Sequence, residues 1–208
     1  MKKRAFFITL EGSEGSGKST HLKFLADFFR KRGFKVETFR EPGSTFLGEK
    51  IRKLLLYSKE EIFPLTELFL YLSARAQFVE EKLKYSLRKS DIVISDRFSD
   101  STLVYQGYAL GLGMEKIEKL VRFACKDLKP DITFVLDVEP KKGLRRIKRI
   151  KDRIEKRPFS FHYRLRRGYK VLAKKEPGRI KIIKAKSINY VRKRMLEYIE
   201  EKLKCKRK

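Results

Sequence analysis

One segment near the start of the chain constrains the fold more than any other. An apolar run at residues 6–10 leads into a glycine-rich loop, in which Gly12 is followed after four residues by Gly17, Lys18 and Ser19. This is the spacing of a P-loop. Glycine tolerates backbone angles that other residues resist and leaves its N–H group bare, so the loop can wrap an anion. The positive end of the following helix adds to the attraction. The segment therefore predicts a strand, loop and helix that bind the phosphates of a nucleoside triphosphate.

Short apolar runs and amphipathic segments alternate along the rest of the chain. We predict strands at residues 6–10, 36–39, 92–95, 132–136 and 180–183, and helices at 18–32, 45–56, 66–89, 114–125, 141–148, 161–176 and 188–204, with loop and a short helix at 99–107. This alternation predicts an α/β fold with a five-stranded parallel sheet and helices on both faces. The 208 residues show no internal repeat or linker, so we expect one domain spanning residues 1–208.

Charged residues follow two of the predicted strands, at the edge where ligands bind in an open parallel sheet. Arg40 follows the strand at 36–39, just before a Pro-Gly pair breaks the chain. Asp96 and Arg97 follow the strand at 92–95. An apolar strand that ends in an acid, downstream of a P-loop, is the usual place for the second carboxylate of a Mg²⁺ site. An Asp that only caps the next helix is the alternative.

Two further residues have a role that spacing alone leaves open. Tyr71 and Arg75 lie one turn apart at the border of the apolar stripe of the helix predicted at 66–89, so they share a face. An aromatic residue at such a border usually belongs to the core, and an arginine there usually extends along the surface. Packing and ligand binding both remain possible.

The chain is strongly basic, with 53 Lys and Arg against 26 Asp and Glu and a net charge of +27, which suggests a polyanionic ligand or partner. Residues 141–170 hold 14 of the basic residues and only 2 acidic ones. Within this stretch, residues 149–159 are too charged to bury, and we predict that they form a mobile, arginine-rich lid that supplies cations when substrate is present. The other basic side chains are expected to face solvent.

The sequence also argues against a membrane span and against a metal centre built on histidine. No apolar run approaches the roughly 20 residues that span a bilayer, so we expect a cytoplasmic protein without membrane attachment. His21 and His162 are isolated in the sequence, and a metal centre built on histidine is therefore not expected.

Five motifs occur in order along the chain: EGSEGSGKST at 11–20, REPGST at 40–45, LSAR at 72–75, DRF at 96–98 with YQG at 105–107, and DRIE at 152–155. This set, which covers residues 6–185, resembles the thymidylate kinase family, which phosphorylates dTMP to dTDP with ATP and Mg²⁺. The resemblance implies a three-layer fold of the P-loop nucleoside monophosphate kinase type with a short basic lid. It also implies a homodimer and no specific nucleic-acid partner.

The resemblance further implies roles for individual residues. Those expected to bind ATP are Gly12, Ser13, Glu14, Gly15, Ser16, Gly17, Lys18, Ser19 and Thr20. Those expected to bind dTMP are Glu14 near the sugar, Arg40 and Arg97 at the 5′-phosphate, Tyr71 and Arg75 at the base, and Thr102, Tyr105 and Gln106 around the base and deoxyribose. Those expected to act in catalysis are Lys18, Asp96, Arg97, Arg149 and Arg153, with Ser19 and Asp96 at the Mg²⁺ ion.

The lid is expected to carry the catalytic arginines, because residues 13–16 of the P-loop contain no Arg and the lid contains several. In this respect the chain resembles the bacterial, lid-arginine branch of the family. Two positions depart from the family's pattern: Ser44 replaces a second Gly in EPGGT, and Phe98 replaces the usual Tyr after Asp-Arg. Ser44 leaves the shape of the turn after Arg40 open.

Two other functions remain as alternatives. One is a kinase for another pyrimidine deoxynucleoside monophosphate, because base selection rests on a few side chains only. The other is a nucleic-acid-binding protein switched by a nucleoside triphosphate, which the basic surface suggests. The excess charge lacks the interleaved aromatic residues of a stacking platform, so the kinase is favoured.

Overall fold

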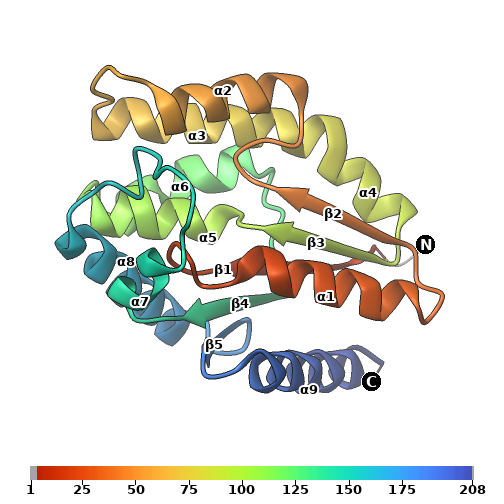
Figure 1. Ribbon diagram of the computed structural model, residues 1–208. Helices are drawn as coiled ribbons and strands as arrows, with labels where there is room; N and C mark the ends of the chain where they lie inside the picture. Colours follow the sequence, from red (N-terminus) through yellow and green to blue (C-terminus); the bar gives the residue numbers. More distant parts are fainter. Residues whose placement is uncertain (1–3, 208) are drawn as a thin grey trace.

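The computed structural model describes residues 4–207, with side chains up to residue 203, and has three layers around one parallel sheet (Figure 1). The strands are β1 (Phe6–Glu11), β2 (Val36–Arg40), β3 (Ile92–Asp96), β4 (Ile132–Asp137) and β5 (Ile180–Lys184). Their order is β2-β3-β1-β4-β5, and all four neighbouring pairs are parallel. The predicted five-stranded parallel sheet is thus confirmed.

Helices cover both faces because successive strand residues point to opposite sides. Phe6, Ile8 and Leu10 pack toward α1 (Lys18–Arg30) and α9 (Ile188–Arg207). Phe7 packs in a second core with residues of α3 (Pro64–Phe78), α4 (Lys84–Lys89) and α6 (Met114–Ala124). A third core joins β4 and β5 to α8 (Phe159–Lys175), and α2 (Phe46–Tyr57) packs on α3.

Two helical stretches contain a π turn. η1 (Val79–Leu83) joins α3 to α4, so the helix predicted at 66–89 is continuous. α5 (Ser99–Thr102) continues into η2 (Leu103–Ala109), and the loop expected within 99–107 is therefore wrong. The polar residues of this segment suggested a loop, but they are buried and bonded to distant partners: Ser101 donates to Glu11 at 2.5 Å. π turns often re-aim side chains at functional sites, and η2 carries Tyr105 and Gln106.

The helix before the lid is shorter than predicted and touches the P-loop. α7 (Pro140–Arg145) ends three residues before the predicted residue 148. Its Gly143 lies directly against the P-loop, because a Cβ atom on Gly15 would come within 1.9 Å of the Gly143 carbonyl oxygen. Only two facing glycines permit this approach of the two backbones.

Three strands deliver the predicted site residues to one edge of the sheet. In the strand register, Asp96 pairs with Leu10 on one side and with Arg40 on the other. The carboxyl ends of β1, β2 and β3 therefore meet at this edge, where the P-loop begins.

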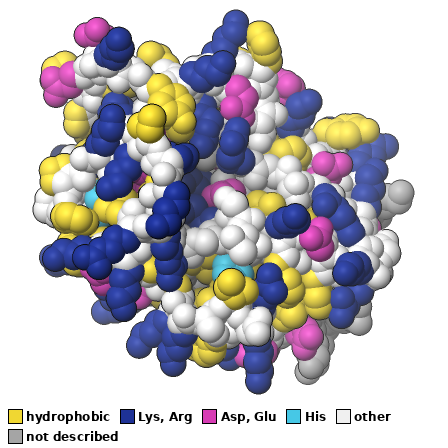
Figure 2. Space-filling view, in the orientation of Figure 1, with side chains coloured by type: hydrophobic (Ala, Val, Ile, Leu, Met, Phe, Trp, Pro, Cys, Tyr) yellow, Lys and Arg dark blue, Asp and Glu magenta, His cyan; other side chains and the backbone are white. Residues whose placement is uncertain are grey.

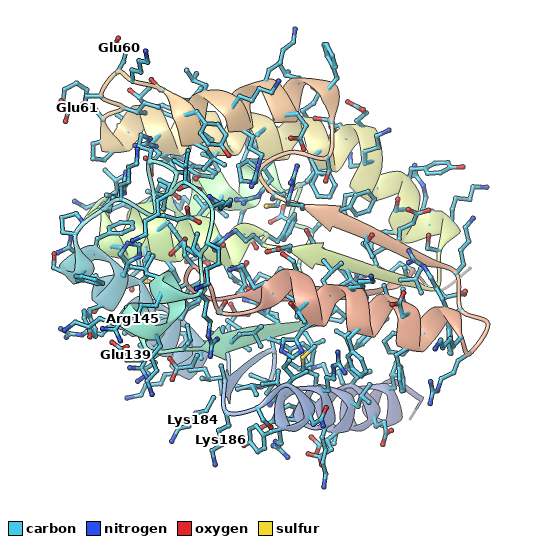
Figure 3. The ribbon with its side chains drawn as sticks, viewed as in Figure 1. Glu60, Glu61, Glu139, Arg145, Lys184 and Lys186 are labelled. Carbon is cyan, nitrogen blue, oxygen red and sulfur yellow. The ribbon has the colours of Figure 1, made fainter. Side chains whose placement is uncertain are left out.

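The basic residues spread widely over the surface. Figure 3 shows Lys184 and Lys186 pointing away from the body of the protein near the start of α9, while Glu60 and Glu61 lie at the tip of the loop between α2 and α3. All four are exposed. No helix in the described part of the chain combines the length and apolar character needed to cross a membrane.

Candidate active site

The P-loop joins β1 to α1 and holds a buried lysine. Gly17 precedes α1 with φ +94°, a left-handed conformation that glycine adopts without strain. Lys18 turns back over the loop, and its Nζ donates to the carbonyl oxygens of Gly12 and Ser13, both at 3.1 Å. Burial lowers the pKa of Lys18 to about 8, and the charge of Arg97 adds to this effect. A desolvated cation thus lies at the positive end of a helix, an arrangement that suits a phosphate.

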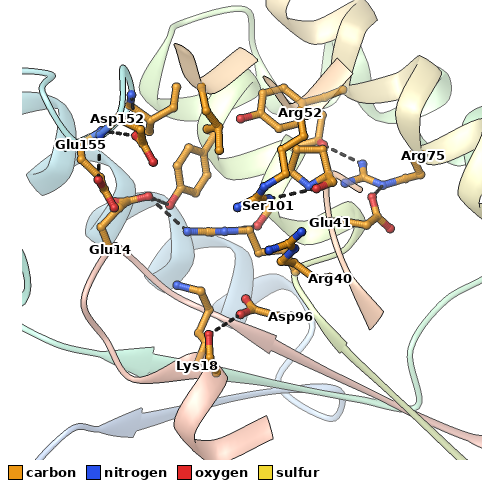
Figure 4. Close-up of a pocket in the computed structure, with 18 of the residues that line it drawn as sticks. Glu14, Lys18, Arg40, Glu41, Arg52, Arg75, Asp96, Ser101, Asp152 and Glu155 are labelled. Atoms are coloured by element: carbon orange, nitrogen blue, oxygen red, sulfur yellow. Dashed lines mark hydrogen bonds and ion pairs between the residues drawn. The ribbon is translucent and has the colours of Figure 1, made fainter. Parts of the chain in front are cut away.

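A cavity of about 400 Å³ opens beside the P-loop (Figure 4). The sequence-predicted residues that line it are Glu14, Gly15, Lys18, Ser19, Arg40, Tyr71, Arg75, Asp96, Arg97, Thr102, Tyr105, Gln106 and Arg149. Figure 4 shows Lys18 and Arg40 entering it from different sides. Lys and Arg side chains surround the corresponding hollow of the surface (Figure 2). The two predicted sets of phosphate-binding residues, Lys18 on one side and Arg40 with Arg97 on the other, therefore share one cavity.

A second cavity of about 590 Å³ adjoins the first. It is lined by residues 15–21, by Arg146 after α7, by residues 185–187 before α9 and by Ile188 and Val191 of α9. Gly15, Lys18 and Ser19 line both cavities, whereas Gly12 and Ser13 line neither. A ligand that fills the second cavity would meet a ligand of the first at Lys18.

Arg40 stands on a turn that its neighbours fix. Ser44 has φ +66°, a left-handed conformation that normally favours glycine, and its hydroxyl accepts from the Arg40 amide and donates to the Arg40 carbonyl oxygen, each at 2.9 Å. The half-exposed guanidinium pairs with Glu49 at 2.9 Å. The turn that the sequence left open is therefore maintained by side-chain hydrogen bonds in place of a glycine.

Arg97 also has a left-handed backbone, with φ +74°. Two contacts hold it: the Ser95 hydroxyl donates to the Arg97 carbonyl oxygen at 2.7 Å, and the next amide, of Phe98, donates to Glu11 at 2.9 Å. Its guanidinium lies 3.1 Å from Glu14 and over the ring of Tyr105. Backbone strain of this kind persists where neighbouring groups impose it, often at a functional site.

Glu14 is the anionic centre of the P-loop. The Tyr105 hydroxyl donates to it at 2.6 Å, and His162, which the sequence left isolated, lies 3.3 Å from its other oxygen. Burial alone would raise the pKa of Glu14, but the contact with His162 and the charges of Arg97 and Lys18 lower it to about 2. Glu14 is thus fixed as a carboxylate beside the arginine that faces the cavity.

Ser19 and Asp96 lie together, as expected for a Mg²⁺ site. The Ser19 hydroxyl donates to Asp96 Oδ2 at 3.1 Å, and both residues line the cavity. Among residues 4–203, no group of three or more His, Cys, Asp or Glu could hold a metal ion on its own. Mg²⁺ in nucleotide sites usually takes one or two protein oxygens and completes its shell with phosphates and water, so this pair fits the ion.

Arg75 does not extend along the surface but is 1 % exposed. Its Nε donates to Glu41 at 2.8 Å, and its two Nη atoms donate to Thr102 at 2.6 Å and to the Phe98 carbonyl oxygen at 3.0 Å. Burial raises the pKa of Glu41 to about 7 although Arg75 opposes this. The guanidinium is therefore rigid at one end of the cavity, close to Tyr71 one turn earlier on α3.

The expectation that residues 149–159 are too charged to bury is wrong only in part: residues 149–151, 156, 158 and 159 are exposed, but Asp152, Ile154 and Glu155 are buried. Asp152 and Glu155 are 7 % and 6 % exposed, and Ile154 packs in the third core. Asp152 Oδ1 accepts from the amides of Ile154 and Glu155, and Arg149 pairs with Glu155 at 2.7 Å. The charges are buried because they satisfy one another within a tight turn.

The structure does not bring the two predicted lid arginines to the same place. Arg149 lines the cavity, whereas Arg153 does not. Arg153 donates to Glu67 at 2.5 Å and to the Leu55 carbonyl oxygen at 2.8 Å. Its assignment to catalysis stays a prediction, which requires Arg153 to leave Glu67.

Sequence reasoning missed two buried carboxylates. Glu11 accepts from Phe98, Ser101 and Tyr169, and burial, with the charge of Asp100, raises its pKa. Glu67 lies beside Leu68 on α3, on the same face as Tyr71 and Arg75, and is fully buried. A charged residue within an apolar run was the available signal in both cases, since such residues are buried only when paired.

A P-loop whose serine bonds to an aspartate, with two arginines at the same sheet edge and the basic segment 149–159 beside them, is the arrangement of a P-loop nucleoside monophosphate kinase. Comparison with known proteins identifies which kind. The family model described as thymidylate kinase matches residues 10–200. The chain belongs to the thymidylate kinase family, which confirms the resemblance drawn from its motifs.

Several relatives match nearly the whole chain. A thymidylate kinase from Caldanaerobacter subterraneus is 44 % identical over 203 residues, which cover 97 % of this chain and 98 % of the relative. One from Bacillus licheniformis is 41 % identical, covering 95 % and 96 %. The crystal structure of thymidylate kinase from Ehrlichia chaffeensis aligns with a TM-score of 0.79 at 34 % identity, covering 95 % of this chain and 99 % of the other. The predicted three-layer fold is therefore shared with a solved member of the family.

Proposed function

We propose that the protein transfers the γ-phosphoryl group of ATP to dTMP and releases dTDP and ADP. The observation that carries this assignment is the shared cavity: Lys18 of the P-loop and the pair Arg40 and Arg97 line it together. Phosphoryl transfer depends chiefly on holding two phosphates in line and neutralising the charge between them. Residues that bind the phosphates of the donor and of the acceptor at one edge of the sheet supply both the alignment and the positive charge.

ATP fits the second cavity and the P-loop, and dTMP fits the first. The residues common to both, Gly15, Lys18 and Ser19, mark where the two phosphate groups would meet. Arg40 and Arg97 pin the 5′-phosphate of dTMP, and Arg40 exchanges Glu49 for that phosphate. The ring of Tyr105 lies beside the deoxyribose and leaves no room for a ribose 2′-hydroxyl.

Ser19 and Asp96 would hold the Mg²⁺ ion of the ATP complex. When bound, the ion supplies positive charge to the phosphate oxygens. Lys18 contributes the protein's own cation at the same point, and Arg149 is the lid cation that lines the cavity. The lid, at about residues 149–159, excludes water that would otherwise compete as acceptor.

A coupled assay of ATP consumption against a panel of monophosphates tests this function. We expect dTMP to give the highest kcat/KM, with dUMP, dCMP and UMP as competitors. A higher value for dCMP would favour the alternative kinase. Activity with none of them, combined with tight, salt-sensitive binding of an oligonucleotide, would favour the nucleic-acid alternative.

We infer that the active form is a homodimer. Large apolar side chains remain exposed on α2, α3 and α6 and just before α3, and α3 packs against both other helices. They are Phe46, Leu47, Leu54, Tyr57, Phe63, Leu65, Phe69, Leu120 and Phe123. An apolar area of this kind suits a second copy of the chain. We place the reaction in the cytoplasm, where ATP and deoxynucleotides are available.

A further inference from the structure

Glu67 on α3 is a buried carboxylate to which the reaction described above assigns no part. It is fully buried, yet both of its oxygens are occupied by donors from elsewhere in the chain. Oε1 accepts from Gln106 Nε2 at 2.8 Å. Oε2 accepts from Arg153 at 2.5 Å and from Arg157 at 2.7 Å. One carboxylate thus joins α3, the π turn η2 and the lid.

The Oε1 contact fixes the orientation of the Gln106 amide. A carboxylate accepts hydrogen bonds and donates none, so the amide must turn its NH₂ group toward Glu67. The carbonyl oxygen of Gln106 then faces away from Glu67. Gln106 lines the cavity, and within the described residues no donor reaches that carbonyl oxygen. The side-chain carbonyl oxygen of Gln106 is therefore a free hydrogen-bond acceptor for a ligand in the cavity.

An acceptor in a fixed orientation distinguishes pyrimidine bases. Thymine and uracil carry an N3–H group, which can donate to it. Cytosine has an unprotonated N3, whose lone pair would face the same carbonyl oxygen. A freely turning amide could serve either base, whereas a fixed one rejects cytosine because a buried polar pair would be left mismatched.

The Oε2 contacts hold the lid at the same end of the cavity. Arg153 and Arg157 bring two positive charges to side-chain positions that are 18 % and 16 % exposed. Glu67 is their common counter-charge, and its loss would leave both guanidinium groups poorly solvated. Asp152 and Ile154, between and beside these arginines in the chain, line the cavity. The position of the lid residues that line the cavity therefore depends on Glu67.

We propose that Glu67 is a positioning residue that orients Gln106 to select bases with N3–H and anchors the lid through Arg153 and Arg157. Base selection and lid order then depend on a single side chain. The part that concerns base selection rests on the proposed function, and the part that concerns the lid does not.

Glu67→Gln tests both parts, because it keeps the shape of the side chain but removes the charge and adds an NH₂ group. We expect the ratio of kcat/KM for dTMP to that for dCMP to fall at least about ten-fold. We also expect trypsin to cleave the nucleotide-free protein within residues 149–157 at least about ten-fold faster, because the anchored lid opens more often. Trypsin cleavage needs no substrate. Its rate therefore measures how firmly Glu67 holds Arg153 and Arg157, whether or not the protein phosphorylates dTMP.

Asp100→Asn is the matched control. Asp100 is also a buried carboxylate paired with an arginine, Arg179 at 2.7 Å, but neither residue lines the cavity. This variant should lose stability without changing either the base ratio or the rate of lid cleavage. Glu67→Asp keeps the charge one methylene short of its partners, and it should change both readouts in the same direction as Glu67→Gln but by less.

An unchanged base ratio or unchanged lid protection in folded Glu67→Gln would overturn the proposal, which assigns both to one carboxylate. If that variant does not fold, Glu67→Asp decides by the same criterion. A parent protein inactive on dTMP would instead refute the proposed function, and the part of the inference on base selection with it.

Discussion

Replacing Lys18 by methionine is expected to change stability in a pH-dependent way. Lys18 is only 9 % exposed, and burial lowers its pKa from 10.5 to about 8. Its charged form is thus less favourable in the folded protein than in the unfolded chain. Between pH 8 and 10.5 the unfolded chain keeps the proton that the folded protein has released, so stability rises with pH. The penalty is about 3 kcal/mol at pH 7 and about 1 kcal/mol at pH 10.

Lys18→Met removes this penalty together with the hydrogen bonds to Gly12 and Ser13. The lost hydrogen bonds cost about 1 kcal/mol each. We expect the variant to be more stable than the parent by about 1 kcal/mol at pH 7 and less stable by about 1 kcal/mol at pH 10. Turnover should fall at least about 100-fold, because the P-loop loses its cation.

Urea unfolding of both proteins at pH 7 and pH 10, without nucleotide, measures the effect. The decisive quantity is the change in the stability difference between the two pH values, about 2 kcal/mol, since the hydrogen-bond loss cancels. Lys23→Met, an exposed lysine on the same helix, controls for the loss of one positive charge. A difference for Lys18→Met that stays constant with pH within about 0.5 kcal/mol would refute the reasoning.

Three further predictions follow from the site and the surface. Arg149→Ala and Arg153→Ala are each expected to lower kcat about 100-fold, and a loss of only a few-fold would remove that arginine from catalysis. Asp96→Asn should raise the Mg²⁺ concentration for half-maximal activity at least about ten-fold, whereas an unchanged Mg²⁺ titration would contradict its place at the ion. Phe69→Arg, on the exposed apolar area of α3, should convert the dimer to a monomer in sedimentation velocity; Phe34→Arg, which is similarly exposed outside that area, should not.

The sequence predicted those parts of the molecule that local spacing determines. The P-loop, the five strands and the charged residues at the ends of β2 and β3 follow from short motifs and apolar runs. Parallel strands then meet at one edge, so the amino-acid order alone was enough to place Arg40, Asp96 and Arg97 together.

Contacts between distant residues could not be predicted in this way. Glu11 bonds to Tyr169 across 158 positions of the sequence, and Arg157 reaches Glu67 across 90. Residues 149–159 were predicted to stay in solvent because the segment is highly charged. In the structure they pair with one another, and such pairing has no signature in composition.

The turn that carries Arg40 has a consequence for the free energy of ligand binding. The Ser44 hydroxyl bridges both backbone groups of Arg40, so this short stretch of main chain has little freedom left once the protein is folded. If Arg40 binds the monophosphate as proposed, a flexible turn would have to be immobilised at every binding event, and part of the binding free energy would be lost in doing so. In this protein the turn loses its conformational entropy once, during folding. The main chain at Arg40 is then already rigid in every later turnover.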